Sequence, residues 1–410
     1  MNRRALMLGT IFLTSFGGIV SLLGATTIST ELGAQVGAPA FFTGVLIAAK
    51  YAPSIVAMPY ATSFAAKWGT KPLFLTGQMI MIVLNLMLAW LIAIGAPTYA
   101  TLVVFTTIMG FVGAMLHALV PVVMKSYLPS KSIAGSLSKA AVANGLAAVL
   151  GALFGTVMLA HVVPELTFVV NAVFTIPYVL VLWLTKPATP VGSPTHVKHA
   201  WRTLATTLTK NRRVLRASLL AVTATLFIGP MSSMVVPLTR DTGIALTSNA
   251  GYLLAVLAIG QMFSPYGVGA LSRRFNGYYG GATAIIVAAF ALIGFAASVW
   301  LRDPAWVMYA GVIVASLIFG NMRYAAENLL IDDVATAVQG KGTTQGNISA
   351  FEFLASLAAP IGPLIWGAMM DGVGAVSMLI ILSAILVVLT LLFIRRARHE
   401  GVANTPLVSR

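Results

Sequence analysis

The feature that most constrains this chain is a run of about 20 or more apolar residues that recurs from one end of the sequence to the other. A helix needs roughly 20 apolar residues to cross the hydrocarbon core of a bilayer. On this measure we predict twelve membrane-spanning helices. They cover residues 5–29, 41–64, 72–94, 98–122, 134–160, 166–185, 215–238, 249–271, 279–301, 305–329, 345–370 and 374–394.

The composition excludes a soluble domain. Of the 410 residues, 59% are apolar and only 9% are charged, which is too few charges to cover a water-facing surface. The net charge of +15 could indicate nucleic-acid binding, but the basic residues fall in short clusters between the apolar runs, as membrane topology signals do. We therefore expect an all-α membrane protein whose partners include membrane lipids and exclude nucleic acid.

The sequence gives no sign of an enzyme or of a bound cofactor. It contains no cysteine, which excludes disulfides and thiolate metal sites. The motifs His-Glu-x-x-His and Gly-x-Ser-x-Gly are absent, and the neighbouring His196 and His199 have no acidic companion. We expect no catalytic residue, no metal and no cofactor.

One long polar interruption divides the chain into two nearly equal halves. Residues 186–214 contain three prolines, several basic residues and no acidic residue, which is typical of a basic linker. We therefore predict one six-helix bundle over residues 1–185, a second over residues 215–396 and a polar tail over residues 397–410.

The loop charges predict the orientation in the membrane. If both termini lie on one side, every lysine and arginine of the loops falls on that side except Arg240 and Arg302. Positive charge is retained in the cytoplasm. We therefore expect a multi-pass protein of the plasma (inner) membrane with both termini cytoplasmic.

Two short loops resemble the motif of a known family. The run Ala66-Lys67-Trp68-Gly69-Thr70-Lys71 is similar to the turn between the second and third helices of the major facilitator superfamily, usually Asp-Arg-x-Gly-Arg-Lys. A counterpart, Leu271-Ser272-Arg273-Arg274-Phe275-Asn276-Gly277, occupies the same place in the second half. Ala66 and Arg273 stand where the family usually has Asp, and Thr106 stands where many proton-coupled members have Arg.

With the twelve spans and the basic linker, this resemblance covers essentially the whole chain. It implies two pseudo-symmetric six-helix bundles and a secondary transporter that works by alternating access. We expect such a unit to function as a monomer. The resemblance also implies gating roles for five loop residues, which are Gly69, Lys71, Arg273, Arg274 and Gly277.

Charges inside the apolar runs are candidates for function, because an ionised side chain in hydrocarbon is costly unless it is paired or faces water. Lys50 lies in the second span and Glu31 at the outer end of the first, and the two could form an ion pair that joins these spans, or could act on a substrate or gate. Arg323 and Glu327 stand one helical turn apart. They predict either an intrahelical salt bridge or a binding pair.

Glu352 is the strongest candidate for proton exchange. It lies between Phe351 and Phe353, with no neighbour in sequence that could neutralise it. The competing interpretation is a static pair with Lys139 or with Arg323. A second candidate, His117, could titrate near neutral pH or could simply hydrogen-bond a neighbouring helix.

Glycine and proline predict breaks in several spans. Gly229-Pro230 lies in the seventh span, Ala359-Pro360-Ile361-Gly362-Pro363 in the eleventh, and Pro53 and Pro59 in the second. The fifth span carries Gly145, Gly151 and Gly155. Transporters place sites and hinges at such positions.

The leading hypothesis is proton-coupled export of an amphipathic small molecule, such as a drug, a siderophore or another metabolite, because aromatic residues are frequent at cavity depth. Uptake or facilitated movement of a small organic anion is the alternative that Lys50, Lys139 and Arg323 favour. From another class, a lipid flippase and a non-transporting membrane sensor both fit the same sequence.

Overall fold

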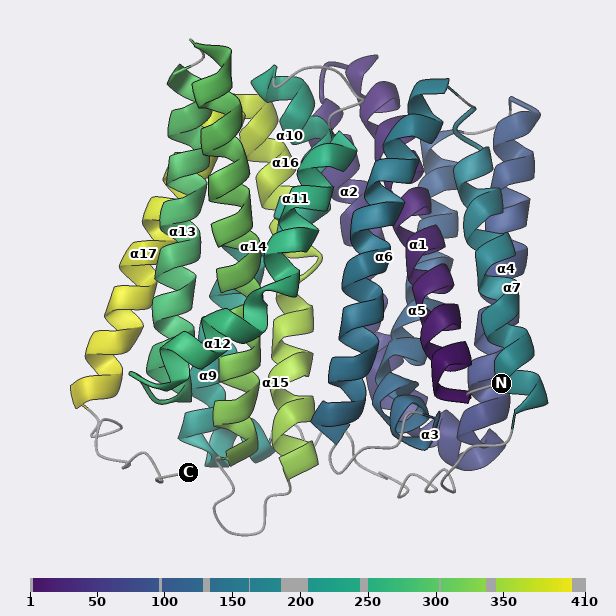
Figure 1. Ribbon diagram of the computed structural model, residues 1–410, viewed down its shortest axis with the longest axis horizontal. Helices are drawn as coiled ribbons and strands as arrows, with labels where there is room; N and C mark the ends of the chain where they lie inside the picture. The colour runs from purple at the N-terminus through teal and green to yellow at the C-terminus, as the bar shows by residue number, and fades with distance from the viewer. Residues whose placement is uncertain are drawn as a thin grey trace. The chain divides into compact units, whose positions relative to one another are not determined.

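The computed structural model describes residues 3–95, 98–127, 133–161, 163–185, 206–243, 250–301, 304–336 and 344–399. Every regular element in these ranges is a helix, drawn and labelled in Figure 1. The predicted all-α class is therefore confirmed. Residues 186–205 of the predicted linker and residues 400–410 of the predicted tail lie outside the described ranges.

The spans agree with the predicted number. Eleven helices in the described part of the chain are long and apolar enough to cross a membrane. A twelfth span is supplied by two shorter helices, α11 (Ala250–Met262) and α12 (Ser264–Ser272), that meet at a bend of 41°. The predicted edges were short at several ends, because a helix continues past the apolar core into the polar interface.

The chain divides into two compact units. The first comprises Met1–Lys198 together with Ser233–Ala258, and the second comprises His199–Ser232 together with Ile259–Arg410. The helices of the first unit are α1 (Arg3–Ala34), α2 (Pro39–Tyr51), α3 (Ser54–Trp68), α4 (Thr70–Ala93), α5 (Tyr99–Tyr127), α6 (Ile133–His161), α7 (Leu166–Leu184), α10 (Val235–Thr242) and the start of α11.

The first unit is built around α1, which packs against α2, α6 and α7. Hydroxyl and amide groups join these helices where they cross. The Ser15 hydroxyl donates to Asn144 Oδ1 of α6 at 2.7 Å, and Asn171 Nδ2 of α7 donates to Ser21 Oγ and to Asn85 Oδ1, each at 3.1 Å. The hydroxyl-rich first span therefore uses several of its polar groups to hold helices together.

The second unit contains α9 (Arg212–Phe227), the 3₁₀ turn η1 (Gly229–Ser232), α12, α13 (Gly277–Leu301), α14 (Ala305–Thr336), α15 (Thr344–Ala358), α16 (Ile361–Val373) and α17 (Ala375–His399). Its α13 and α14 pack side by side (Figure 1). Small residues make this close packing possible, since Ala282, Ala288, Ala289 and Ala296 of α13 are completely buried.

The breaks predicted from proline are present in three spans. The second span breaks between Tyr51 and Ser54, the seventh between Phe227 and Val235, and the eleventh between Ala358 and Ile361. Proline lacks the N–H that would continue the hydrogen-bond ladder. The structure differs at Pro59, which lies inside the continuous helix α3. The glycines of the fifth span lie inside the continuous helix α6.

Two of these breaks lie against each other in the second unit. A Cβ added to Gly362 would lie 3.0 Å from Pro230 Cγ and 3.1 Å from the carbonyl oxygen of Leu226. The two broken segments therefore approach each other closely there. The indole Nε1 of Trp366, a completely buried side chain, donates to the carbonyl oxygen of Phe227 at 3.2 Å. This bond occupies the end of α9, where backbone carbonyls lose their helical partners.

Candidate functional site

Lys50 and Glu31 do not form the predicted ion pair. Glu31 is exposed near the end of α1, and Lys50 is half-buried in the last turn of α2. Within the described residues, neither has an ion-pair partner. The Lys50 ammonium lies 6.0 Å from the centroid of the Tyr51 ring.

The backbone at Lys50 is fixed by a glycine of α5. A Cβ added to Gly110 would overlap the carbonyl oxygen of Lys50, so only glycine allows α5 to approach α2 this closely. Pro53 follows three residues later, in the break between α2 and α3. Lys50 therefore lies directly before a helix break, and its backbone packs tightly against α5.

Arg323 and Glu327 do not form the predicted salt bridge either. The Arg323 guanidinium lies 5.3 Å from the centroid of the Tyr324 ring, and its Nη1 donates to Ser232 Oγ at 3.4 Å. Arg323 therefore contacts the 3₁₀ turn in the break of the seventh span. Glu327 is exposed and has no cation within ion-pair distance in the described residues.

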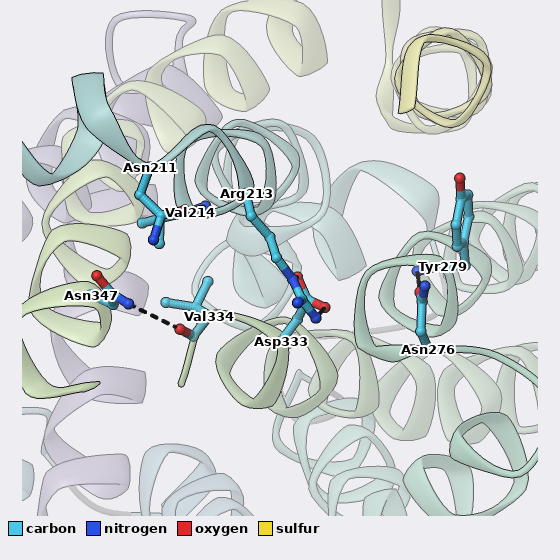
Figure 2. Close-up of polar contacts among 8 residues, drawn as sticks. All are labelled: Asn211, Arg213, Val214, Asn276, Tyr279, Asp333, Val334 and Asn347. Carbon is cyan, nitrogen blue, oxygen red and sulfur yellow. Dashed lines mark hydrogen bonds and ion pairs between the residues drawn. The ribbon is translucent and has the colours of Figure 1, made fainter. Parts of the chain in front are cut away.

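Helix register instead brings Glu327 to the level of Glu352. Asn347 Nδ2 of α15 donates to the carbonyl oxygen of Val334 at 3.4 Å and joins the start of α15 to the end of α14 (Figure 2). Glu327 stands seven residues before Val334, and Glu352 stands five residues after Asn347. At 1.5 Å per residue, both carboxylates lie roughly 8–10 Å from this bond along their helices.

The two carboxylates are close enough to interact electrostatically. Both side chains are exposed, and in the described part of the chain no cation pairs with either of them. The competing pair between Glu352 and Arg323 is not formed. The pair between Glu352 and Lys139 stays untested, because the Lys139 side chain lies outside the described residues although its backbone lies in α6.

An ion pair that the sequence did not predict lies near the same end of the second unit. Arg213 of α9 donates from Nη2 to Asp333 Oδ1 at 2.6 Å and from Nε to Asp333 Oδ2 at 3.1 Å (Figure 2). The Asp333 side chain is 1% exposed and that of Arg213 is 31% exposed. Because the two nitrogens meet both carboxylate oxygens, the pair has the fork geometry that makes such contacts strong.

Asparagine side chains complete this end of the second unit. Asn211 Oδ1 accepts from the backbone N–H of Val214 at 3.3 Å and caps the start of α9 (Figure 2). Asn276 Oδ1 accepts from the N–H of Tyr279 at 3.0 Å and does the same for α13. These bonds satisfy N–H groups that a helix start leaves without a partner.

The loop residues predicted to gate have different surroundings. Gly69 separates α3 from α4 at a φ of +86°, which favours glycine. Lys71 Nζ donates to the carbonyl oxygens of Trp183 at 3.3 Å and Thr185 at 3.0 Å, at the end of α7. Lys71 therefore caps a helix C-terminus, where positive charge is favourable.

In the second loop, Gly277 is required by packing. A Cβ there would lie 2.8 Å from Asp333 Cβ and 2.9 Å from the carbonyl oxygen of Leu329. Arg273 and Arg274 are exposed. The loop therefore lies against the helix that carries Asp333.

His117 is exposed on α5 and is in contact with a partner, which agrees with the hydrogen-bonding alternative as well as with a titrating group. Within the described residues, no three histidine or acidic side chains lie close enough together to hold a metal ion.

Comparison with known proteins assigns the fold. The profile of the Major Facilitator Superfamily matches residues 5–360. No curated protein sequence matches the chain.

Solved transporters share the architecture over nearly the whole chain, at low identity. A D-xylose–proton symporter has a TM-score of 0.76 at 11% identity, covering 95% of this chain and 96% of its own. The nucleoside transporter NupG, in a mutant form, has a TM-score of 0.72 at 16% identity, covering 96% and 99%. The human organic anion transporter MFSD10 (TETRAN) has a TM-score of 0.67 at 14% identity, covering 96% and 100%.

The profile match covers most of the chain and agrees with the helical architecture, the predicted spans and the loop motifs. It also excludes the enzyme alternative in favour of a multi-pass membrane transporter. The chain belongs to the major facilitator superfamily.

Proposed function

We propose that this secondary transporter moves an amphipathic small molecule in exchange for protons, and that Glu352 and Glu327 carry the proton. The observation that supports the proposal is the pair of carboxylates at one level of adjacent helices, with no cation in the described residues to neutralise them. In an apolar span, such groups are stable only when they face water or bind a counter-charge.

A proton is the simplest counter-charge. The repulsion between two neighbouring carboxylates is relieved when one of them binds a proton and returns when that proton leaves. If the exposed face of α14 and α15 opens to each side of the membrane in turn, the pair binds the proton on one side and releases it on the other. Protein carboxylates in transporters serve such relays.

The broken helices support a moving structure. The breaks in the seventh and eleventh spans contact each other through Gly362 and Trp366. A break leaves fewer backbone hydrogen bonds to resist bending than a continuous helix does. We infer that the two spans bend together when the transporter changes state.

The names of structural neighbours favour proton coupling. The D-xylose–proton symporter and the fucose–proton symporter of E. coli are both described by the proton that they move. Export and antiport are our prediction from the sequence. A second candidate, transport of a small organic anion, is favoured by Lys50, which has no ion-pair partner within the described residues.

Proton flux in proteoliposomes tests the proposal. The purified chain is reconstituted with an internal pH-sensitive dye and exposed to a panel of cationic, neutral and anionic amphipathic compounds. We expect at least one compound to drive proton movement, and Glu352→Gln to reduce that flux by roughly tenfold or more because its side chain cannot exchange a proton. Glu327→Gln should reduce it less.

The matched control is Glu165→Gln, which makes the same chemical change in the first unit, at the loop before α7. It should leave the flux unchanged. Transport that is equal in Glu352→Gln and insensitive to a pH gradient would exclude proton coupling through this pair and favour facilitated movement of the solute.

A further inference from the structure

Lys50 is far from both ends of its span. It stands eleven residues after Pro39, where α2 begins, and eighteen residues before Trp68, where α3 ends. These separations correspond to about 16 Å and about 27 Å of helix. Lysines near helix ends extend their charge to the interface, but this lysine is too deep to do so.

The described residues offer this ammonium group no counter-charge. No carboxylate of the described residues lies within ion-pair distance, and the nearby aromatic ring is that of Tyr51, at 6.0 Å from Nζ to the centroid. A cation–π contact at this distance is weak compared with an ion pair. The charge at this depth therefore requires either water or a bound anion.

The surroundings of Lys50 are aromatic and partly accessible. Tyr51, whose ring centroid lies 6.0 Å from the Lys50 ammonium, is 39% exposed. A fixed cation beside an exposed aromatic ring matches a molecule that has a negative group on an aromatic or apolar body.

We propose that Lys50 is an anion-binding subsite at the break of the second span, and that it binds the carboxylate, sulfonate or phosphate of the transported molecule. The inference rests on the proposed transport function and specifies its substrate class as an amphipathic organic anion. Gly110 holds the subsite in place by fixing the Lys50 backbone against α5.

Binding of matched probes tests the subsite without requiring transport. 2-Naphthoate and 2-naphthamide share one aromatic body and differ in charge, and naphthalene sulfonate and naphthyl phosphate extend the series to other anions. The melting temperature of the purified protein in neutral detergent is measured with each probe, for the unchanged protein and for Lys50→Met, Lys50→Arg and the exposed control Lys210→Met.

We expect at least one anion to raise the melting temperature of the unchanged protein, of Lys210→Met and of Lys50→Arg, and naphthamide to raise it much less. Lys50→Met should lose the shift and show at least a tenfold weaker apparent affinity. Gly110→Ala keeps the lysine but displaces its backbone, so it should weaken anion binding as well. A series in which no anion binds in a Lys50-dependent way would overturn the proposal.

An anionic lipid could supply the same chemistry, so the measurement is repeated in phosphatidylcholine nanodiscs with and without phosphatidylglycerol. Lys50-dependent stabilisation by phosphatidylglycerol alone, with none by the soluble anions, would overturn the assignment to a transported solute. Normal anion binding by Lys50→Met together with lost proton flux in Glu352→Gln would refute the subsite and leave the proposed function standing.

Discussion

Asp333 and Glu352 are both carboxylates near one end of the second unit, yet the protein surrounds them differently. Asp333 is 1% exposed and receives two hydrogen bonds from Arg213. Glu352 is exposed, and it interacts electrostatically with another carboxylate, that of Glu327. The bond between Asn347 and Val334 joins the start of α15 to α14 one residue after Asp333 and sets the register of Glu327 and Glu352.

The comparison distinguishes charges that stabilise the fold from charges that remain available to bind a proton or a substrate. A buried ion pair with good geometry satisfies its own charges and leaves little reason for a ligand to bind. Charges that lack a partner at depth require water, a proton or a substrate. By this criterion Arg213 and Asp333 are structural, whereas we propose that Lys50, Glu327 and Glu352 belong to the transport path.

The largest expected effect comes from breaking the pair. Asp333→Asn leaves the Arg213 guanidinium without its counter-charge, and we expect a loss of about 3–5 kcal/mol in the free energy of unfolding, nearer the lower value because Arg213 is partly exposed. Thermal and denaturant unfolding of the purified protein in detergent measure this loss.

The charge-free double variant Arg213→Met with Asp333→Leu sharpens the same test. Replacing both partners by apolar residues removes the unpaired charge, so most of the lost stability should return. Equal destabilisation in the single and double variants would show that the two residues contribute through packing. Asp333 would then no longer be an example of a carboxylate that stabilises the fold through its ion pair.

An intermediate effect is expected at the contact between the two broken spans. Trp366→Phe removes the Nε1 donor from the partly buried carbonyl oxygen of Phe227, which should cost about 1–3 kcal/mol, nearer the lower value. The control is Trp306→Phe, because that side chain is 72% exposed. A Trp366→Phe variant as stable as the control would mean that the breaks do not hold each other.

The smallest effect is expected at Lys71. Lys71→Met removes the charge that caps α7 and should lower the free energy of unfolding by about 0.3–1 kcal/mol, with transport per folded molecule nearly unchanged. Lys67→Met, an exposed neighbour, serves as the control. A large loss of transport in Lys71→Met at normal stability would restore the gating role that the family resemblance implies.

The sequence carried most of the fold because apolar length and loop charge act locally. Runs of apolar residues predicted the spans, and Pro53, Pro230 and Pro360 predicted breaks, since each lacks a backbone N–H. The bend at Phe263 was missed, although Pro265 at the start of α12 could have indicated it. Pro59 shows the reverse error, because neighbouring helices can support a proline within a membrane helix.

The site was less predictable because it depends on which helices meet. Arg213 and Asp333 are 120 residues apart, and nothing local indicates that the start of α9 lies beside the end of α14. The spacing of Arg323 and Glu327 correctly placed them one turn apart, but Arg323 contacts Ser232 across the unit instead. The juxtaposition of Glu327 and Glu352 likewise follows from the register that Asn347 sets.

The most direct test compares substrate-driven proton flux, per folded molecule, in Glu352→Gln and in the charge-free pair Arg213→Met with Asp333→Leu. Both variants remove a carboxylate near the same end of the second unit. We predict that the charge-free pair retains the flux of the unchanged protein, whereas Glu352→Gln loses it. Retained flux in Glu352→Gln, with flux lost in the charge-free pair, would contradict the account.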